Sequence, residues 1–426
     1  MSENPQMVED TPMADNSPME SLEDFAIRAR AWISANLPPA SNEPRTRDEQ
    51  LAIGRVLQAK IFDAGFAGIA VPKRYGGAGL TLEHQRVWAE EVVGYAIPDY
   101  FKVSVGMMMP TVLDCGTEAV KQRHIPRILR GDEIWIQLLS EPSGGSDLAG
   151  ALTRAEASEG GYRVNGSKMW SSGAKHADYG LCLARVDWDV PKHQGLIMLI
   201  VDLKAPGVDI HPIQSAQGGM AHFCMEYLDD VAVPEEYRLG GESEGWTVAQ
   251  RLLFHERNGI AGVGYGQGFG GSNGGGGGSS QWRLGLSPIV RDSGLSLDDP
   301  AYAALLADDY IETVVSEQLE ARVDIGMRSG KLQGQWASLV KLDMGGSNPR
   351  NAERAMAVAG ADGVIWSGDR GGDIPLHWLS VRGGSIAGGS NEIQRNIVSE
   401  RLMGLPREPN PDKETPYGEV IRRTKR

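Results

Sequence analysis

The stretch that decides the fold is Ser140-Glu-Pro-Ser-Gly-Gly-Ser-Asp147, followed one strand-like segment later by Lys168-Met-Trp-Ser-Ser172. Gly144 and Gly145 allow the backbone to approach a ligand closely, and the neighbouring serines offer short hydrogen-bonding groups. Trp170 stands among small hydroxyls, a combination that suits a planar heteroaromatic ligand. The residues alone leave a second interpretation open, in which this is an ordinary β-hairpin edge with one packed tryptophan.

The two segments together resemble the paired signatures of the acyl-CoA dehydrogenase flavoproteins, and the resemblance runs from about Leu22 to Pro406. It implies FAD as the cofactor. It also implies an α+β fold class with an N-terminal helical domain, a middle β-barrel and a C-terminal four-helix bundle. The matched positions that would bind the cofactor are Leu139, Ser140, Ser146, Trp170, Ser172, Ser390 and Glu392. Those that would bind the substrate are Ser146, Arg257 and Ala387.

The composition limits the class of protein. A chain of 426 residues is long enough for about two to three domains. A formal net charge of −14 argues against nucleic acid and against anionic membrane surfaces as partners. Cys115, Cys182 and Cys224 are too few and too scattered for a disulfide framework or a metal site, so we expect no metal and a reducing, cytoplasmic location. No apolar stretch has the length of a transmembrane helix.

Periodicity and composition divide the chain into five parts. Residues 1–20 are acidic and aperiodic, and we expect a disordered tail there. Helical spacing of apolar residues predicts an N-terminal α-helical domain over 21–132, and short turn-bounded strands predict a β-barrel over 133–240. The resemblance implies that this barrel binds the flavin and the substrate. Helices return over 241–406, and a charged tail, draped or loose, covers 407–426.

Two turns are expected in the β domain. One is Val164-Asn-Gly166, and the other is Asp229-Asp-Val-Ala-Val-Pro234, which would close the domain and return the chain to helix. His124 lies upstream of both and is expected to make a structural contact rather than to act as a catalyst.

The helix expected from Gly245 to Gly268 carries the candidate base. Glu256 falls on its apolar stripe between Leu253 and Ile260. A buried carboxylate is costly unless it is paired or used, and burial raises its pKa towards the range of a general base. The spacing alone leaves an ion pair between Glu256 and Arg257 equally open. One branch of the resembling family places its catalytic glutamate on this helix just before an arginine, and this favours Glu256.

The last signature of the family is matched by Ser385-Ile-Ala-Gly-Gly-Ser-Asn-Glu-Ile-Gln-Arg395. Most members carry their base two residues before the Ser, and Gly388 occupies that position here. Gly388 cannot take a proton, but its backbone N–H can still donate to the thioester oxygen as an oxyanion-type donor. Glu392 is a carboxylate nearby that the match aligns with a cofactor-facing position, so it ranks second to Glu256 as the base.

Between these matches the sequence departs from the family. A Gly-rich linker covers 264–280, and the Arg-Lys-x-Phe-Gly segment that reaches the neighbouring subunit's FAD is absent. In the Gln-x-x-Gly-Gly motif that touches the same FAD, the Gln position is Ala357 and one Gly is Ala361. Both contacts are therefore in doubt. Their loss favours a hetero-oligomer with a related subunit over a homotetramer.

The resemblance thus implies FAD-dependent α,β-dehydrogenation of an acyl-CoA, with an electron-transfer flavoprotein as the oxidant of the reduced flavin. The small residues Ala387 and Gly388 leave room for branched or bulky acyl groups such as steroid side chains. Two alternatives remain open. One is a non-catalytic or FAD-supporting subunit of a heteromeric dehydrogenase, and the other is a flavin oxidase relative.

Overall fold

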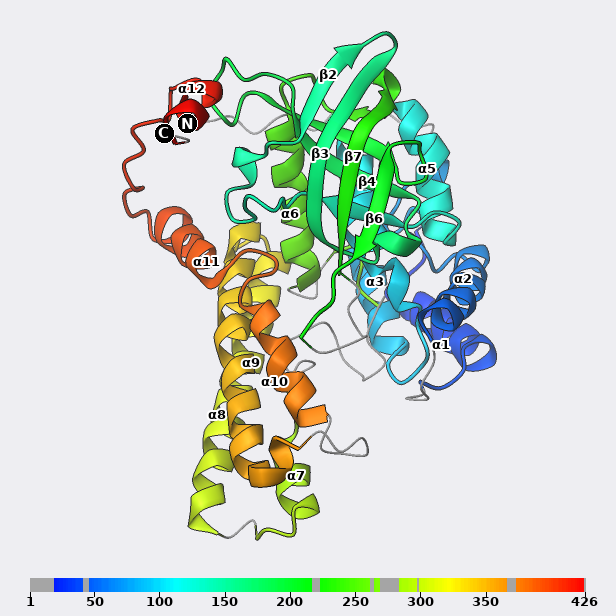
Figure 1. The fold of residues 1–426 in the computed structure, drawn as a ribbon. Helices are drawn as coiled ribbons and strands as arrows, with labels where there is room; N and C mark the ends of the chain where they lie inside the picture. The colour runs from blue at the N-terminus through cyan, green and yellow to red at the C-terminus, as the bar shows by residue number, and fades with distance from the viewer. Residues whose placement is uncertain are drawn as a thin grey trace.

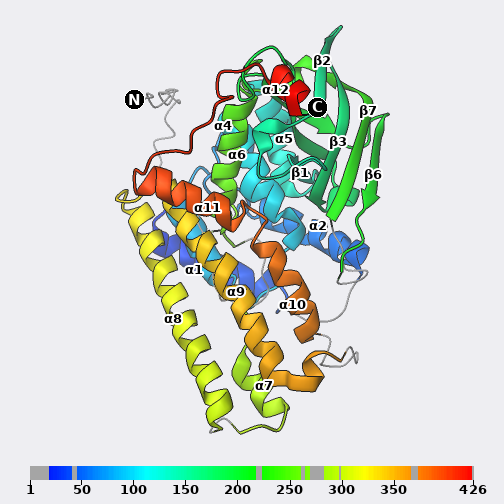
Figure 2. The ribbon, with the colours of Figure 1, turned by 60° about the vertical axis from the view of Figure 1, so that its left-hand side comes forward.

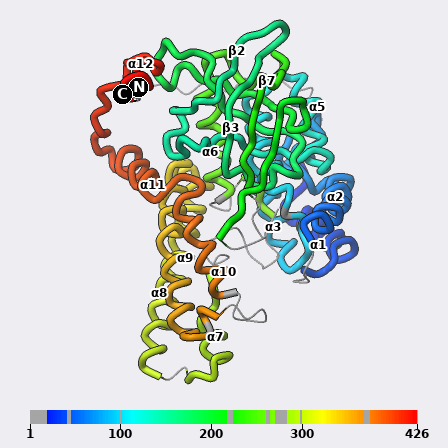
Figure 3. Tube along the Cα trace, viewed as in Figure 1, coloured from blue at the N-terminus to red at the C-terminus, as the bar shows by residue number. Residues whose placement is uncertain are grey.

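The computed structural model describes residues 19–40, 46–216, 223–260, 264–268, 283–296, 299–365 and 373–424. These residues form an N-terminal helical region, a central β-sheet and a C-terminal helical lobe that projects away from the other two (Figure 1). The turned view shows the same lobe extending below the sheet (Figure 2), and the Cα trace follows its helices back towards the sheet (Figure 3). Nearly all of the expected N-terminal tail, and most of the Gly-rich linker, lie outside the described residues.

Five α-helices make up the described part of the N-terminal region, which confirms the helical spacing seen in the sequence. They are α1 (Leu22–Asn36), α2 (Arg47–Asp63), α3 (Leu82–Glu91), α4 (Met109–Cys115) and α5 (Glu118–Arg130). The side chains of Ser21, Thr46 and Thr117 cap α1, α2 and α5 by accepting a backbone N–H. In the core between the helices, Phe66 and Trp88 stack with their ring centroids 4.8 Å apart.

His124 on α5 is a structural contact, as predicted. Its side chain is fully buried, and its Nδ1 lies 2.8 Å from Glu133 Oε2. The ring packs edge-on against Trp135, Tyr179 and Tyr237. Trp135 Nε1 donates to the same Glu133 Oε2 at 3.0 Å. The cluster joins the N-terminal helices to the first strand of the sheet.

One mixed sheet of eight strands forms the middle of the molecule. Its strands are β1 (Trp135–Leu138), β2 (Arg154–Ser158), β3 (Gly161–Ser172), β4 (Tyr179–Arg185), β5 (Leu196–Asp202), β6 (Val208–Pro212), β7 (Phe223–Pro234) and β8 (Arg238–Leu239). They pair in the order β6-β7-β3-β2-β4-β5-β8, and β1 runs parallel to β4. Because β5 also contacts β7 across the interior, the sheet curls onto itself. The expected β-barrel takes this form of a curled mixed sheet.

The two predicted turns are wrong, because both segments lie within long strands that pair with each other and meet at one β-bulge. β3 continues through Val164-Asn-Gly166, and β7 continues through Asp229–Pro234. At the bulge, Asn165 lies opposite two residues of β7. One of them, Asp230, has a φ of +53°, and its N–H donates to Asn165 Oδ1 at 2.8 Å. Asn-Gly is typical of turns, but the same residues suit the left-handed backbone and side-chain hydrogen bonds of a bulge.

A buried ion pair ties four strands together. Lys168 Nζ on β3 donates to Glu141 Oε1 at 2.8 Å, to Leu139 O at 3.2 Å and to Leu183 O at 2.6 Å. The Glu141 carboxylate also accepts the N–H groups of Leu152 at 2.7 Å and Thr153 at 2.9 Å. Burial by itself would raise the pKa of Glu141, but the Lys168 ammonium and the Leu152 N–H hold it below its usual value. The pair therefore joins the ends of β1 and β4 to β3 and to the approach to β2.

Replacing Lys168 by Met would leave the Glu141 carboxylate buried without a counter-charge. We expect Lys168→Met to lower the free energy of unfolding by about 3–5 kcal/mol, the usual effect of breaking a buried pair. Chemical denaturation of both proteins measures this. Lys204→Met is the control, since that exposed ammonium pairs at the surface with Asp178, and its loss should cost about 1 kcal/mol or less. Equal effects of the two substitutions would contradict a dominant role for the buried pair.

The described part of the C-terminal lobe is built around helix α9. Its helices are α6 (Gly245–Ile260), α7 (Leu286–Asp292), α8 (Pro300–Arg328), α9 (Ala337–Ala359), α10 (Asp373–Gly384) and α11 (Asn391–Ile397). Helix α9 contacts all five others. Small residues allow this: a Cβ added at Gly345 would lie 2.1 Å from Asn391 Oδ1 on α11. The expected C-terminal helical bundle is confirmed.

After α11 the chain leaves the lobe and returns to the β domain, where it ends in α12 (Tyr417–Thr424) (Figures 1 and 2). The tail predicted over 407–426 is therefore draped over the molecule as far as it is described. Among the described helices, none is both long and apolar enough to cross a membrane.

Candidate active site

Glu256 lies on the side of α6 that meets the sheet. Its carboxyl is half-buried, and this burial raises its pKa above the usual value. A hydrogen bond from the side chain of Gln137 and the positive charge of Lys341 oppose that rise in part. Gln137 belongs to β1, whose end leads directly into the loop that begins at Ser140. The contact therefore brings the candidate base next to the strand that feeds the first signature.

Arg257 does not neutralise its neighbour through a direct pair. Consecutive residues of an α-helix point about 100° apart, and Arg257 Nε has no hydrogen-bond partner in the described part of the chain. Burial lowers the pKa of Arg257, and the nearby charge of Glu256 opposes this effect. The guanidinium is a half-buried cation with at least one unused donor, Nε, and its contact with the substrate stays a prediction.

Lys341 is a member of this cluster that the sequence reasoning missed. Its side chain on α9 is 5% exposed, and Nζ donates to Gly384 O at the end of α10 at 2.6 Å. Burial lowers the pKa of Lys341, while the charge of Glu256 raises it. The ammonium thus links the surroundings of Glu256 to the segment that leads to Gly388. A lysine in the run Ala337-Ser-Leu-Val-Lys341 was the available signal, because a lysine on an apolar helix face is costly unless it has a partner.

Gly388 lies in the turn before α11, and its φ of +66° is one that glycine adopts without strain. Its carbonyl accepts a hydrogen bond from Gln394 Nε2 at 2.8 Å, which fixes the peptide plane on that side. The neighbouring Ala387 is exposed. Ser390 caps α11 by accepting the Ile393 N–H at 3.4 Å. Its hydroxyl is therefore shared between the cap and any cofactor contact.

Glu392 sits in a very different environment from Glu256. Its side chain is exposed, and the backbone N–H of its own residue, with help from Ser390, holds its pKa below the usual value. A carboxylate of this kind binds a proton weakly, so it is a poorer base than Glu256 near neutral pH. The geometry thus supports the ranking made from the sequence.

The first signature forms a tight loop over the end of β1. The N–H and C=O groups of Glu141 and Gly144 bond each other at 3.2 and 3.0 Å. Leu139 is buried beneath the loop and Ser146 is exposed on it. A Cβ at Gly145 would approach Ser140 Oγ to 3.3 Å, so the small residue lets the loop close over that hydroxyl.

The second signature is joined to the first and presents a flat ring outwards. Met169 N donates to Ser140 O at 2.9 Å. The next residue, Trp170, has a φ of +69° and remains 54% exposed, with its ring edge-on to Phe223. A non-glycine residue in this conformation is strained, and such strain is concentrated at functional sites. With exposed Ser172 beside it, the indole fits a planar aromatic group such as a flavin, with serines at its edge.

A second carboxyl with a raised pKa lies inside the sheet. Glu226 on β7 pairs across the sheet with Lys168 on β3, is fully buried, and accepts a hydrogen bond from Ser171 Oγ at 3.0 Å. Burial raises its pKa to about 7, although Ser171 and Lys168 act against the rise. Trp170 and Ser172, by contrast, are exposed. The carboxyl of Glu226 is thus buried inside the sheet, whereas the predicted flavin surface is exposed.

The structure brings the predicted residues together in two groups. Leu139, Ser140, Trp170 and their neighbours form one group, and Glu256 with Arg257 forms the other. Lys341, which was not predicted, belongs with the second group, and Gln137 lies between the two. No hydrogen bond or ion pair within the described residues joins the turn at Ala387–Glu392 to the first group. The same residues hold no cluster of His, Cys, Asp and Glu suited to a metal ion.

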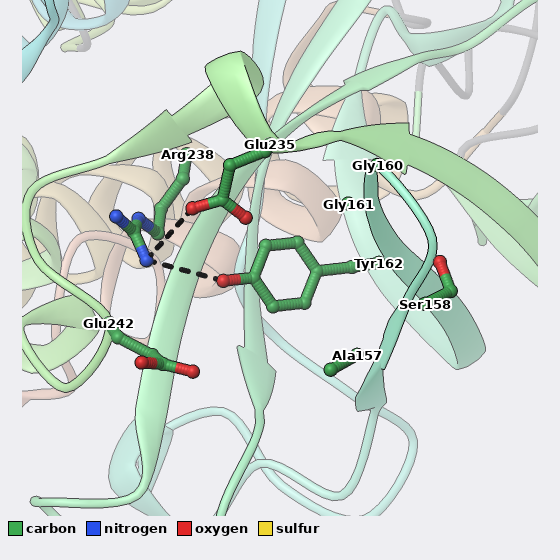
Figure 4. A pocket seen from close by; sticks show the side chains of 8 residues that line it. All are labelled: Ala157, Ser158, Gly160, Gly161, Tyr162, Glu235, Arg238 and Glu242. Atoms are coloured by element: carbon green, nitrogen blue, oxygen red, sulfur yellow. Dashed lines mark hydrogen bonds and ion pairs between the residues drawn. The ribbon is translucent and has the colours of Figure 1, made fainter.

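A shallow pocket of about 310 Å³ lies elsewhere, at the β2–β3 hairpin (Figure 4). Within it, Arg238 Nη1 lies 3.1 Å from Glu235 Oε1 and donates to the Tyr162 hydroxyl at 3.3 Å. Its lining residues are Ala157, Ser158, Gly160, Gly161, Tyr162, Glu235, Arg238 and Glu242. None of them is a predicted site residue, so this pocket is distinct from the candidate active site.

Comparison with known families tests the resemblance seen in the sequence. Models of the acyl-CoA dehydrogenase N-terminal, middle and C-terminal domains match residues 19–132, 137–231 and 291–403. The chain belongs to the acyl-CoA dehydrogenase family. It is accordingly an FAD-dependent acyl-CoA dehydrogenase, which confirms the predicted fold class, activity and cofactor.

Individual relatives cover almost the whole of this acyl-CoA dehydrogenase. It is 30% identical over 410 residues to acyl-CoA dehydrogenase IpdE1 of Mycobacterium tuberculosis, covering 92% of this chain and 99% of that protein. It is 31% identical over 409 residues to acyl-CoA dehydrogenase FadE26 of the same organism, covering 90% and 97%. Among solved structures it is similar to the Tcur3481-Tcur3483 steroid ACAD, with a TM-score of 0.71, 28% identity, and coverage of 91% and 98%.

The charge of Lys341 should be visible in the pH dependence of the reaction. Because that charge lowers the pKa of Glu256, Lys341→Met should raise this pKa further. The rise of kcat/KM with pH should then move to higher pH, so activity at pH 6 relative to pH 9 should fall. Lys331→Met, at an exposed position, is the matched control and should leave the profile in place. If the pH profile of Lys341→Met does not shift, or shifts to lower pH, the charge of Lys341 does not lower the pKa of Glu256.

Proposed function

We propose that Glu256 is the base that removes the α-proton of the acyl-CoA thioester. The observation that carries this proposal is the raised pKa of a half-buried carboxyl, held by Gln137 beside the strand that enters the flavin loop. A base with its pKa moved up towards the working pH accepts a proton more effectively than an ordinary surface carboxylate. The charges of Arg257 and Lys341 keep that pKa from rising too far.

The other residues of the proposed site bind and orient. Leu139, Ser140, Ser146, Trp170, Ser172, Ser390 and Glu392 would hold the FAD, with Trp170 against its ring. When bound, FAD supplies the oxidant that takes up the β-hydrogen with its electron pair. Ser146, Arg257 and Ala387 would contact the acyl-CoA.

Gly388 would stabilise the charge that develops on the thioester oxygen. Its carbonyl is already bonded to Gln394, and its N–H would donate to the enolate oxygen as Glu256 removes the proton. A fixed donor aimed at developing charge contributes most in a site from which water is excluded. The absence of a side chain at Gly388 also leaves space for the acyl group.

The choice of base can be tested directly. Glu256→Gln keeps the shape and hydrogen bonding of the side chain but cannot accept the proton, so turnover should fall by at least about 10²-fold with FAD still bound. Anaerobic bleaching of the flavin by a panel of acyl-CoAs measures the reductive step alone. Glu317→Gln, at an exposed position of α8, is the matched control and should leave the rate of flavin reduction unchanged. If only Glu392→Gln stops bleaching, Glu256 is not the base.

We further propose a hetero-oligomer with a related subunit. Ala357 is exposed on α9 and Ala361 on the short helix that follows, and neither can make the charge-assisted contact to an FAD diphosphate. The relative of TM-score 0.71 is named for two chains, Tcur3481 and Tcur3483, and as a steroid dehydrogenase. Together these observations support a partner chain that supplies the missing contacts, and a substrate with a steroid side chain. A homotetramer is the alternative assembly.

Expression of this chain alone tests the assembly. Each lost contact to the anionic diphosphate should cost roughly 1.5–3 kcal/mol, about ten- to a hundredfold in affinity. The isolated chain should therefore lose FAD on size-exclusion chromatography, and co-expression with a related chain that carries the arginine and glutamine should restore it. A stable homotetramer with one FAD per chain would rule out the need for a partner. In that case, catalysis by the homotetramer would also exclude the alternative that this chain is only an FAD-supporting subunit.

Two further assignments complete the proposal. An electron-transfer flavoprotein would reoxidise the flavin, and slow reaction of the reduced enzyme with oxygen would set it apart from an oxidase. Cys115, Cys182 and Cys224 are free thiols, and burial raises the pKa of Cys182 to about 11. Free, unreactive thiols support a reducing, cytoplasmic location.

A further inference from the structure

The C-terminal tail docks on the β domain through a short set of specific contacts. Tyr417 N donates to Val190 O at 2.9 Å, and Gly418 N donates to Trp188 O at 2.8 Å. The Tyr417 ring stacks on Trp188 with an interplanar angle of 17°, and its side chain is almost completely buried. The tail is therefore built into the β domain, although it arrives from the far helical lobe.

The segment under the tail is the continuation of the first signature. Tyr417 Oη donates to Gly150 O at 2.8 Å. A Cβ added at Gly150 would lie 3.1 Å from that hydroxyl and 2.7 Å from Asp147 Oδ2, so the contact leaves no spare room. Ser146, a predicted contact of both cofactor and substrate, comes immediately before this segment.

A buried arginine beside Tyr417 holds the same segment. Arg185 on β4 is fully buried, and it donates to Ala149 O at 2.5 Å, Ala151 O at 3.1 Å and Lys192 O at 3.1 Å. Its guanidinium lies 4.1 Å from the centroid of the Tyr417 ring. A cation over an aromatic face is attracted to it, most strongly where water is excluded. Arg185 and Tyr417, which contact each other, together clamp the segment Asp147–Ala151 through three successive carbonyl groups.

We infer that Tyr417 is a positioning residue for acyl-CoA binding, because it fixes the segment Asp147–Ala151 and thereby the place of Ser146. The inference rests on the proposed role of Ser146 in the substrate site. Tyr417 itself touches neither substrate nor flavin. Its loss should therefore weaken the binding of acyl-CoA and leave the proton transfer at Glu256 largely unchanged.

The test is Tyr417→Phe in the holoenzyme with its natural partner. This change removes one hydroxyl but keeps the stacked ring. KM for acyl-CoA should rise about two- to tenfold, the range that one net hydrogen bond supplies, while kcat stays within about twofold and FAD content is unchanged. Amide hydrogen exchange over 148–151 should become faster. Tyr310→Phe, on an exposed side chain of α8, should change none of these quantities.

Gly150→Ala perturbs the same contact from the loop side and should reproduce both effects. Unchanged exchange over 148–151 in Tyr417→Phe would overturn the clamp. Faster exchange with an unchanged KM would show that Tyr417 holds the segment but does not affect substrate binding. A fall in kcat or a loss of FAD at constant KM would show that Tyr417 has a purely structural role. If the unmodified enzyme turned over no acyl-CoA, the proposed function would be wrong. The exchange measurement would still show whether Tyr417 holds residues 148–151 in place.

Discussion

The buried contact between the Lys168 ammonium and the Glu141 carboxylate is the interaction on which the rest of the site depends. A charge removed from water is tolerated only where every neighbouring dipole is in place. The Lys168 ammonium meets this condition because it donates to backbone carbonyl oxygens just after β1 and within β4. The Glu141 carboxylate meets it because it accepts two backbone N–H groups just before β2. The positions of the flavin loop and of the exposed Trp170 follow from it, since both flank the pair directly in sequence.

Three glutamates in this chain show how environment assigns different chemistry to one side chain. The pKa of Glu141 is held down by the ammonium beside it, and Glu141 serves the fold. Burial raises the pKa of Glu226 to about 7 inside the sheet, away from the flavin surface. Burial also raises the pKa of Glu256, but there two cations and Gln137 moderate the effect. Burial alone therefore does not identify a base, and position relative to the cofactor decides.

The parts of the molecule that sequence could predict are those set by local pattern or by a family signature. The helices, the α+β architecture and the family belong to this group, whereas the ranking of Glu256 above Glu392 as the base stays a prediction. Lys341 was missed because its partners, Gly384 and Glu256, come from other helices and no local spacing joins them. Val164-Asn-Gly166 was misread because a bulge and a turn use the same residue types, and only the pairing with β7 distinguishes them.

The docking of α12 also has a consequence for how the chain is made. The hydrogen bond between Tyr417 and Gly150 spans 267 positions of sequence, and contacts of such long range form late because a large loop must close first. Since synthesis proceeds from the N-terminus, the ribosome completes the β domain long before it releases the residues that clamp it. The helix that finishes the loop is therefore made well after the β domain that it contacts, so this contact is added to a domain whose strands already exist.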